Sequence, residues 1–368
     1  MISRRTLLMA TGAGALAGAG WLSWTAHRPT YDEVVREVWR HRSPDQGGLM
    51  AYLVHYATLA ANSHNTQPWR FAESGNLITL SANMARATPA ADPDFHHLYA
   101  SLGCAAENLR LAAGAAGQAA EISFSAAENG QVQIALASSR APRDPLFDAI
   151  LERQCSRGLY DGRKVPPREL ADLTASAKEA GGRALVIEDK AVIEQILELS
   201  IEANTRQIND ATFREELKSW LRFSGAHAAE SRDGLYGPCA GNPAMPSFLG
   251  DLVFDFTFRA EAENDKLAEQ VRSSAGLMVF ISDADDKAHW VQSGRGYQRF
   301  ALHATAFGVR HAFVNQPVDV PEVRAQLSEL LGLRSARPDL MVRFGYGKAM
   351  PKSLRRPVNA VIAQGSAS

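Results

Sequence analysis

The chain has little cysteine, little net charge and no long apolar run after its first thirty residues. Its 368 residues include three cysteines, and 39 basic residues balance 40 acidic ones. Three scattered thiols are too few for a disulfide framework or a structural zinc site. A balanced charge gives no general attraction to nucleic acid, so we expect no nucleic-acid partner. No later segment reaches the roughly 18 apolar residues that a membrane span needs.

Several catalytic motifs are also missing. The sequence has no GxSxG, Walker A, HExxH or CxxC pattern, so the serine hydrolase, P-loop, zincin and thioredoxin classes lack their defining residues. Its ten histidines show no compact metal spacing with carboxylate partners. We therefore predict no metal site, name no catalytic side chain and expect no specific protein partner.

The first thirty residues have the composition of an export signal. Arg4 and Arg5 precede an uncharged segment of small and apolar residues that ends before His27. A paired arginine in this position is similar to a twin-arginine signal, whose partner is the twin-arginine export machinery. An uncleaved N-terminal anchor, or a start site placed too far upstream, is the alternative. The expected location is periplasmic, or anchored on the outer face of the inner membrane.

After residue 30, helical and strand patterns are mixed and fall into two similar halves on either side of residues 141–145. Residues 103–117 match residues 294–308 in the spacing of their glycine and apolar positions, which favours an internal duplication. Residues 224–250 are rich in glycine and proline, which indicates a binding loop or lid, or else a disordered segment. The predicted helices are 31–40, 48–61, 98–117, 145–155, 167–180, 190–206, 209–222, 262–274, 287–308 and 321–332, and the predicted strands are 69–72, 77–81, 119–125, 131–137, 183–188, 277–282, 311–315 and 340–344.

The most informative segment runs from Asn62 to Phe71. It leaves a helix, places six polar side chains in succession, and enters a strand through Gln67-Pro68-Trp69. Unsatisfied buried donors cost about 1–3 kcal/mol each. The cluster therefore either caps the local turn or meets a ligand with many hydrogen-bonding groups.

Ser63-x-Asn65-x-Gln67-Pro68-Trp69 resembles the signature of the FMN-dependent nitroreductase family. The longer segment from Asn62 to Phe71 is similar to the Acg-type branch of that family. The resemblance implies an α+β fold with a mixed sheet flanked by helices, normally an intertwined dimer. It also implies that Ser63, His64, Asn65 and Gln67 line an FMN cofactor. The catalytic chemistry would be two-electron hydride transfer through flavin N5 to a small-molecule acceptor such as a nitroaromatic or quinone, with NAD(P)H as a candidate donor.

Basic and amide residues of the second half complete the predicted site. Arg153 and Arg157 match the family's phosphate-binding arginines, and two arginines four apart can converge on one dianion. Cys155 replaces the family's serine between them. By the same resemblance, Asn315 and Gln316 lie near the flavin ring, and Arg355 and Arg356 form a second phosphate clamp. A solvated arginine pair, a polar turn and a basic tail are the respective alternatives.

The two halves have lost complementary parts of this pattern. Arg40-His41-Arg42-Ser43-Pro44 lacks an arginine at its last place, and residues 180–184 lack the Ser/Asn/Gln loop. One site can still be assembled from both halves, so we predict a fused pseudo-dimer with one FMN per chain. The alternative is a flavin-binding or flavin-sequestering protein with little turnover. The predicted organisation is an export signal at 1–30, a first half at 31–142, a second half at 143–360 with a lid-like insertion at 224–250, and a tail at 361–368.

Overall fold

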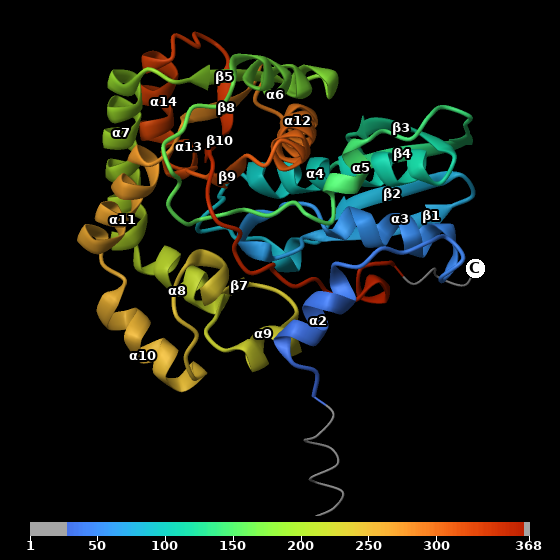
Figure 1. The fold of residues 1–368 in the computed structure, drawn as a ribbon, viewed down its shortest axis with the longest axis horizontal. Coiled ribbons are helices and arrows are strands. Elements are labelled where there is room, and N and C mark those ends of the chain that lie inside the picture. The colour runs from blue at the N-terminus through green and yellow to red at the C-terminus, as the bar shows by residue number, and fades with distance from the viewer. Residues whose placement is uncertain (1–27, 364–368) are drawn as a thin grey trace, which may run out of the picture.

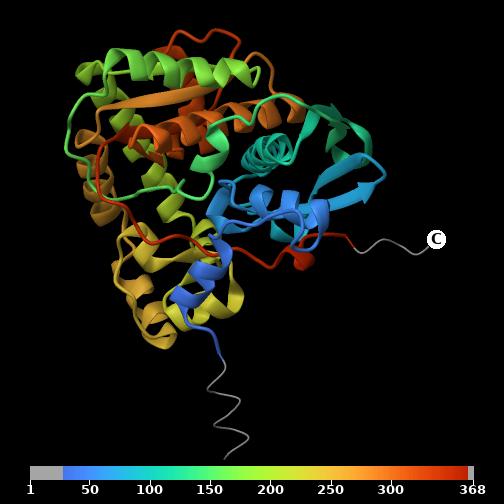
Figure 2. The same cartoon turned by 45° about the vertical axis from the view of Figure 1, so that its right-hand side comes forward.

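The computed structural model describes residues 28–363, and most of the predicted signal and tail lie outside them. The fold is α+β, with two four-stranded sheets whose neighbouring strands are antiparallel (Figures 1 and 2). Among the described residues, no helix has the length and apolar character to cross a membrane. The first half contains α2 (Tyr31–Val38), α3 (Gly48–Thr58), η1 (Ser63–Asn65), β1 (Trp69–Ser74), β2 (Leu77–Ala82), η2 (Met84–Arg86), α4 (His96–Ala115), β3 (Gln118–Ser125), η3 (Ala127–Asn129) and β4 (Gln131–Ser138).

The second half is longer because it carries a mainly helical insertion, residues 188–275, between the first two strands of its four-stranded sheet. Its elements are α5 (Leu146–Ala149), α6 (Pro167–Glu179), β5 (Arg183–Ile187), α7 (Lys190–Asn209), α8 (Ala211–Ser219), β6 (Leu221–Arg222), α9 (Gly225–Ser231), β7 (Leu235–Tyr236), η4 (Gly237–Ala240), α10 (Ser247–Thr257), α11 (Ala260–Arg272), β8 (Gly276–Ser282), α12 (Lys287–Ala306), β9 (Arg310–Phe313), α13 (Gln316–Asp319), α14 (Pro321–Leu330), β10 (Arg337–Gly345) and η5 (Val358–Ala360).

Burial explains the different residue patterns of the two sheets. Every residue of β8 is buried, because Met278 and Phe280 pack in the cluster that includes α12 while Leu277 and Val279 pack against α7 and α11. A strand covered on both faces reads as a continuous apolar run. Strand β1 starts with alternating buried and exposed residues, because one of its faces meets the core and the other meets solvent.

The two halves have the same strand order. The sheets run β1-β2-β4-β3 and β5-β8-β10-β9, and in each half the long helix, α4 or α12, follows the second strand. At the crossing of α4 and α12, a Cβ on Gly103 would lie 2.0 Å from the carbonyl oxygen of Val291, and one on Gly294 would lie 2.0 Å from that of Ala100. Reciprocal contacts of this kind are what a two-fold axis between equivalent halves produces. The predicted α+β class is confirmed, and the equal strand orders and reciprocal helix contacts are consistent with the predicted tandem halves.

The C-terminal segment returns from the second half to the first. Ile362 forms a parallel bridge with Phe71, whose backbone N–H donates to Val361 O at 2.9 Å. This segment gives the first sheet a parallel neighbour beside its antiparallel strands.

Two expectations about local structure were wrong. The helix predicted at 145–155 ends at Ala149, and the next residues are irregular as far as Pro166. Residues 224–250, predicted as one long loop, contain α9, β7, η4 and the start of α10. Glycine and proline in this segment mark the ends of short elements, a role that composition does not distinguish from a loop.

Candidate functional site

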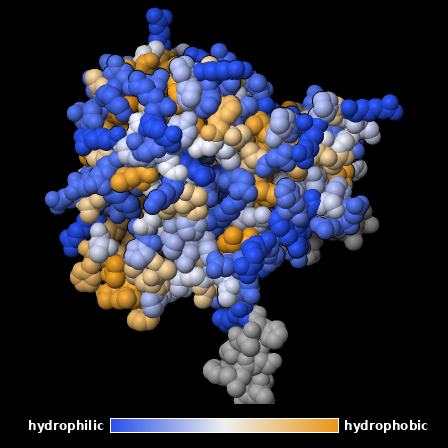
Figure 3. All heavy atoms as spheres, in the orientation of Figure 1, coloured by the Kyte–Doolittle hydropathy of each residue, from blue (hydrophilic) through white to orange (hydrophobic). Residues whose placement is uncertain are grey.

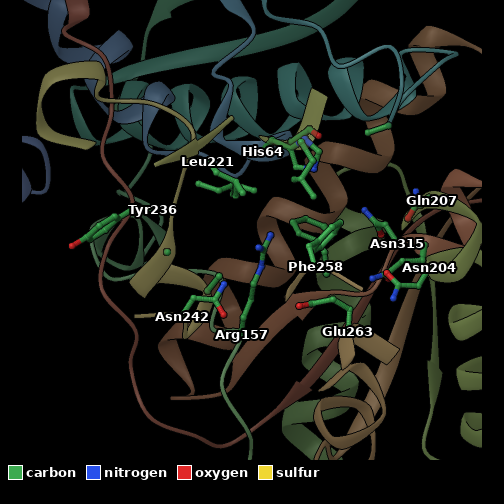
Figure 4. Close-up of a pocket in the computed structure, with 18 of the residues that line it drawn as sticks. His64, Arg157, Asn204, Gln207, Leu221, Tyr236, Asn242, Phe258, Glu263 and Asn315 are labelled. Atoms are coloured by element: carbon green, nitrogen blue, oxygen red, sulfur yellow. The ribbon is translucent and has the colours of Figure 1, made fainter. Parts of the chain in front are cut away.

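A cavity of about 490 Å³ lies where the two halves and the helical insertion meet. The first half contributes η1 and one side of α4, and the second half contributes Tyr297, β9 and α13. The insertion supplies much of the apolar wall, including Leu221 and Phe258 (Figure 4), and Phe254 also lines the cavity. Its size and mixed lining are typical of a small-molecule or cofactor site.

The 62–67 segment enters this cavity in a strained conformation. His64, Asn65 and Gln67 have positive φ angles of 45°, 53° and 55°. Non-glycine residues adopt this region at a cost, and such strain concentrates at functional sites. Hydrogen bonds from Ser63 N to Ser101 Oγ and from Gln67 N to Asn62 Oδ1 hold the turn. The conformation brings Ser63 and His64 to the cavity wall.

Asn65 and Gln67 lie outside the cavity lining and join backbone segments instead. Asn65 Nδ2 donates to Gly234 O at 3.0 Å and to Leu354 O at 3.1 Å. Gln67 Nε2 donates to Arg232 O at 2.9 Å, and its Oε1 accepts from the backbone N of Arg356 at 2.8 Å. These two amides attach both the insertion and the C-terminal segment to the strained turn.

The predicted arginines are divided between the cavity and the core. Arg157 lines the cavity, and its guanidinium points into it in Figure 4. Arg153 is buried and donates to Leu59 O, while its Nε and Nη1 have no hydrogen-bond partner among residues 28–363. Two partnerless guanidinium nitrogens in the interior are suited to an anion that the protein alone does not supply.

Arg355 and Arg356 have protein partners. Arg355 is buried and donates to the carbonyl oxygens of Thr58 and Ala60 at the end of α3, and to Asn65 Oδ1 at 2.8 Å. Burial, together with the nearby charge of Arg153, lowers the pKa of Arg355 to about 9. Arg356 Nη2 donates to Ala360 O. Arg355 therefore fixes the C-terminal segment against the end of α3, whereas the Arg356 side chain bonds within that segment and its Nη1 has no hydrogen-bond partner among the described residues.

The amides at the start of α13 reach the cavity. Asn315 and Gln316 both line it, and Asn315 Oδ1 also accepts from Met341 N at 2.8 Å. Gln316 Oε1 and His64 Nδ1 are buried and have no hydrogen-bond partner within the described chain. Burial lowers the pKa of His64 to about 4, so the ring is neutral at pH 7. Two unsatisfied buried atoms in one cavity indicate a ligand with hydrogen-bonding groups.

A polar cluster that the sequence did not reveal forms another part of the wall. His97 Nε2 hydrogen-bonds the carboxylate of Asp319, whose Oδ2 accepts from Gln207 Nε2 at 3.1 Å. All three residues line the cavity. The adjacent pair His96-His97 was the available signal, but its partners are far away in the chain and only the fold brings them together.

His96 lies beside this cluster but is occupied by protein partners. Its Nδ1 lies 2.8 Å from Asp94 Oδ1 and 3.2 Å from Asp92 Oδ1, and its Nε2 lies 3.2 Å from Asp339 O. Two groups of three, His96-His97-Asp319 and Asp92-Asp94-His96, have the spacing to hold a metal ion, so the expectation that no histidine has carboxylate partners at such spacing was wrong. Because hydrogen bonds already use both ring nitrogens of His96, protein contacts account for this arrangement.

We expect His96 to make the stability of the protein pH-dependent between pH 6.5 and 9. Burial alone would lower its pKa, but Asp92 and Asp94 outweigh burial and raise the pKa from 6.5 to about 9. Because the pKa of His96 is higher in the folded state, its protonation stabilises the folded protein by about 3 kcal/mol below pH 6.5. This contribution to the free energy of unfolding is lost as the pH rises through 9. Urea unfolding at both pH values should show the loss in the wild type and a much smaller loss in His96→Gln. Equal losses would contradict the assignment.

Sequence comparison finds curated relatives over most of the chain. No family model matches it. "Putative NAD(P)H nitroreductase Rv3131" of Mycobacterium tuberculosis is 23% identical over 323 residues, which are 83% of this chain and 88% of the relative. "Putative NAD(P)H nitroreductase acg" of the same species is 23% identical over 321 residues, 84% of this chain and 93% of the relative.

Solved structures with a partial likeness carry similar names. A nitroreductase with bound FMN from Bacteroides fragilis is 14% identical, with a TM-score of 0.34 over 56% of this chain and 89% of that chain. The FMN-dependent nitroreductase NfnB from Mycobacterium smegmatis, in complex with NADPH, is 13% identical, with a TM-score of 0.36 over 58% of this chain and 90% of that chain. The similarity to the two curated relatives extends over most of this chain and over most of each relative.

Proposed function

We propose that this chain is an FMN-binding oxidoreductase of the nitroreductase type, with one cofactor site per chain. The observation that carries the proposal is the cavity between the halves, where Arg157 lies with the unsatisfied buried atoms His64 Nδ1 and Gln316 Oε1. A flavin needs such a combination of a cation for its phosphate, polar groups for its ring edge and apolar walls. When bound, FMN would supply two-electron hydride transfer through N5 to a nitroaromatic, quinone or similar acceptor.

The protein's own residues would bind the cofactor and exclude water. Arg157 would hold the phosphate by charge-assisted hydrogen bonds, and the buried guanidinium of Arg153, which has partnerless nitrogens, would add positive potential. Ser63 and His64 would contact the cofactor from the first half, and Asn315 and Gln316 from the second. The apolar wall of the insertion would keep the site dry, which strengthens each electrostatic contact.

The single site follows from a fused pseudo-dimer that arose by duplication. The matched strand orders and the reciprocal contacts of Gly103 and Gly294 support this origin. The equivalent second site would be formed by residues 40–44 and 180–184. The first segment has no arginine at its last place, and the second lacks the polar loop. We also propose that the protein is exported by the twin-arginine route and acts in the periplasm or at the outer face of the inner membrane, on the basis of Arg4, Arg5 and the uncharged segment after them.

Purified protein is expected to contain one FMN per chain and to reduce a nitroaromatic or quinone with NAD(P)H as the donor. The visible spectrum and the flavin released on denaturation measure the first property, and steady-state oxidation of NADPH measures the second. Two FMN per chain would contradict the single site, and none would overturn the cofactor assignment. A flavin-loaded protein with no turnover would favour flavin sequestration over catalysis.

A further inference from the structure

Helix α10 presents an apolar stripe to solvent. Phe248 is 81% exposed, Leu249 40%, Leu252 55% and Phe256 63%, so four of the seven exposed large hydrophobic residues within 28–363 lie on this one helix. At about 100° per residue, the four side chains fall within an arc of about 100°. Apolar surface gathers at the corresponding edge of the molecule in Figure 3. A continuous exposed stripe of this kind marks an interaction surface.

The inner face of the same helix fixes it in place. Phe254 is buried and stacks on Phe258 with ring centroids 4.6 Å apart. Gly250 lies so close to Phe223 that an added Cβ would come within 2.1 Å of the ring. Gly250, Phe254 and Phe258 also line the cavity. The helix is therefore the outer wall of the site, and its exposed stripe belongs to a packed element.

The size of the stripe favours a bilayer over a second protein copy. A whole aromatic side chain has about 150–250 Å² of surface, so the exposed fractions of the four side chains give an apolar area of roughly 400 Å². A standard protein interface needs about 800 Å² on each partner. A narrow stripe with phenylalanines at both ends instead matches a helix that lies in a membrane interface.

The first described residues lie on the side of the molecule that carries α10. The described chain begins at Arg28, whose Nη1 lies 3.7 Å from Glu230 Oε2 of α9. Both α9 and α10 lie on this side in Figures 1 and 2. Residues 7–24, just before this point, contain no charged side chain. An anchor or signal in that segment would hold α10 close to a bilayer.

Helix α10 carries two acidic residues, Asp251 and Asp255, and no basic one, so burial of the apolar stripe rather than charge would drive docking. Lys218 pairs with Asp255 at 2.8 Å, which neutralises one acidic group on the flank of the helix. Arg259, exposed just beyond the helix end, donates from Nε to Phe256 O. Arginine at the end of an interfacial helix can reach the headgroups while its stem covers apolar surface. We propose that α10 is an interfacial helix that docks the outer wall of the cavity onto a lipid bilayer, whether or not the cavity holds a flavin.

Vesicle binding by the full chain tests the proposal. Wild-type protein should co-sediment with vesicles of phosphatidylcholine and phosphatidylglycerol, and Phe248→Asp with Phe256→Asp should lower the bound fraction roughly tenfold. Leu159→Asp is the matched control, because Leu159 is 57% exposed on another segment and its loss should leave binding unchanged. Thermal unfolding midpoints should agree among all three proteins, since every changed side chain is exposed.

Fluorescence and sedimentation velocity distinguish a lipid surface from a second protein copy as the occupant of the stripe. Phe248→Trp should give a blue-shifted emission when vesicles are added, and Leu159→Trp should not. Wild type that does not bind, or a double variant that binds as well as wild type, would overturn the proposal. It would also be overturned if wild type self-associates in sedimentation velocity without lipid while the double variant is monomeric, because a second copy would then cover α10.

Discussion

Replacing Arg157 by glutamate is expected to remove FMN from the protein while its folding stability stays close to that of the wild type. Arg157 lines the cavity and is partly exposed. A charge-assisted hydrogen bond contributes about 1.5–3 kcal/mol, and a carboxylate in its place would repel the phosphate. The dissociation constant should therefore rise by roughly 100-fold or more. Flavin released from matched amounts of protein, and titration of the apo-protein with FMN, measure the change.

The control and the choice of residue both follow from burial. Arg168→Glu changes the same charge at an exposed position in the first turn of α6 and should leave flavin content unchanged. Arg153 is less suitable, because its buried guanidinium donates to Leu59 O. A carboxylate there would be an unpaired buried charge beside a carbonyl oxygen, at a cost of about 3–5 kcal/mol. Unchanged FMN content in Arg157→Glu would place the phosphate elsewhere.

The spacing of apolar residues along the chain predicted most helices and strands, because these elements depend mainly on residues that are close in sequence. The helix predicted at 98–117 is α4 at His96–Ala115, and the strand predicted at 277–282 is β8 at Gly276–Ser282. The failures occur where tertiary packing decides the structure. Phe254 belongs to a helix whose inner face is defined only by the cavity that it covers. No alternation within residues 247–257 separates that face from the exposed stripe.

The part of the candidate site that lies within one short segment was predictable, whereas contacts between distant segments were not. The motif identified the 62–67 turn, and Ser63 and His64 do reach the cavity. It did not indicate that Asn65 would bond Gly234 and Leu354, residues distant in sequence. The contact between His97 and Asp319 joins the two halves and has no local signature. Residues that bind a ligand and residues that hold the binding turn have the same chemistry, and only the fold separates them.

The crossing of α4 and α12 should be the most sensitive point of the fold. Gly103→Ala and Gly294→Ala each place a methyl group where a carbonyl oxygen lies 2.0 Å away. The obstacle is helix backbone, so the two helices must move apart and the packing around them must open. Overpacked cores typically lose about 1–3 kcal/mol, and a backbone conflict should lie at or above the top of that range. Guanidinium unfolding curves give the loss directly.

Gly114→Ala is the matched control on α4, because no heavy atom lies within 4 Å of the position its Cβ would take. Alanine is favoured over glycine in a helix by about 0.5–1 kcal/mol, so this variant should be as stable as wild type or more so. The double variant of Gly103 and Gly294 should cost less than the two single losses together, since helices already separated by one methyl group accommodate the second. If the losses in free energy of unfolding were additive, the structure would relax independently around each of the two contacts. If either single variant were as stable as Gly114→Ala, α4 and α12 could not cross as closely as the reciprocal contacts require. The main structural argument for pseudo-symmetry between the halves would then fail.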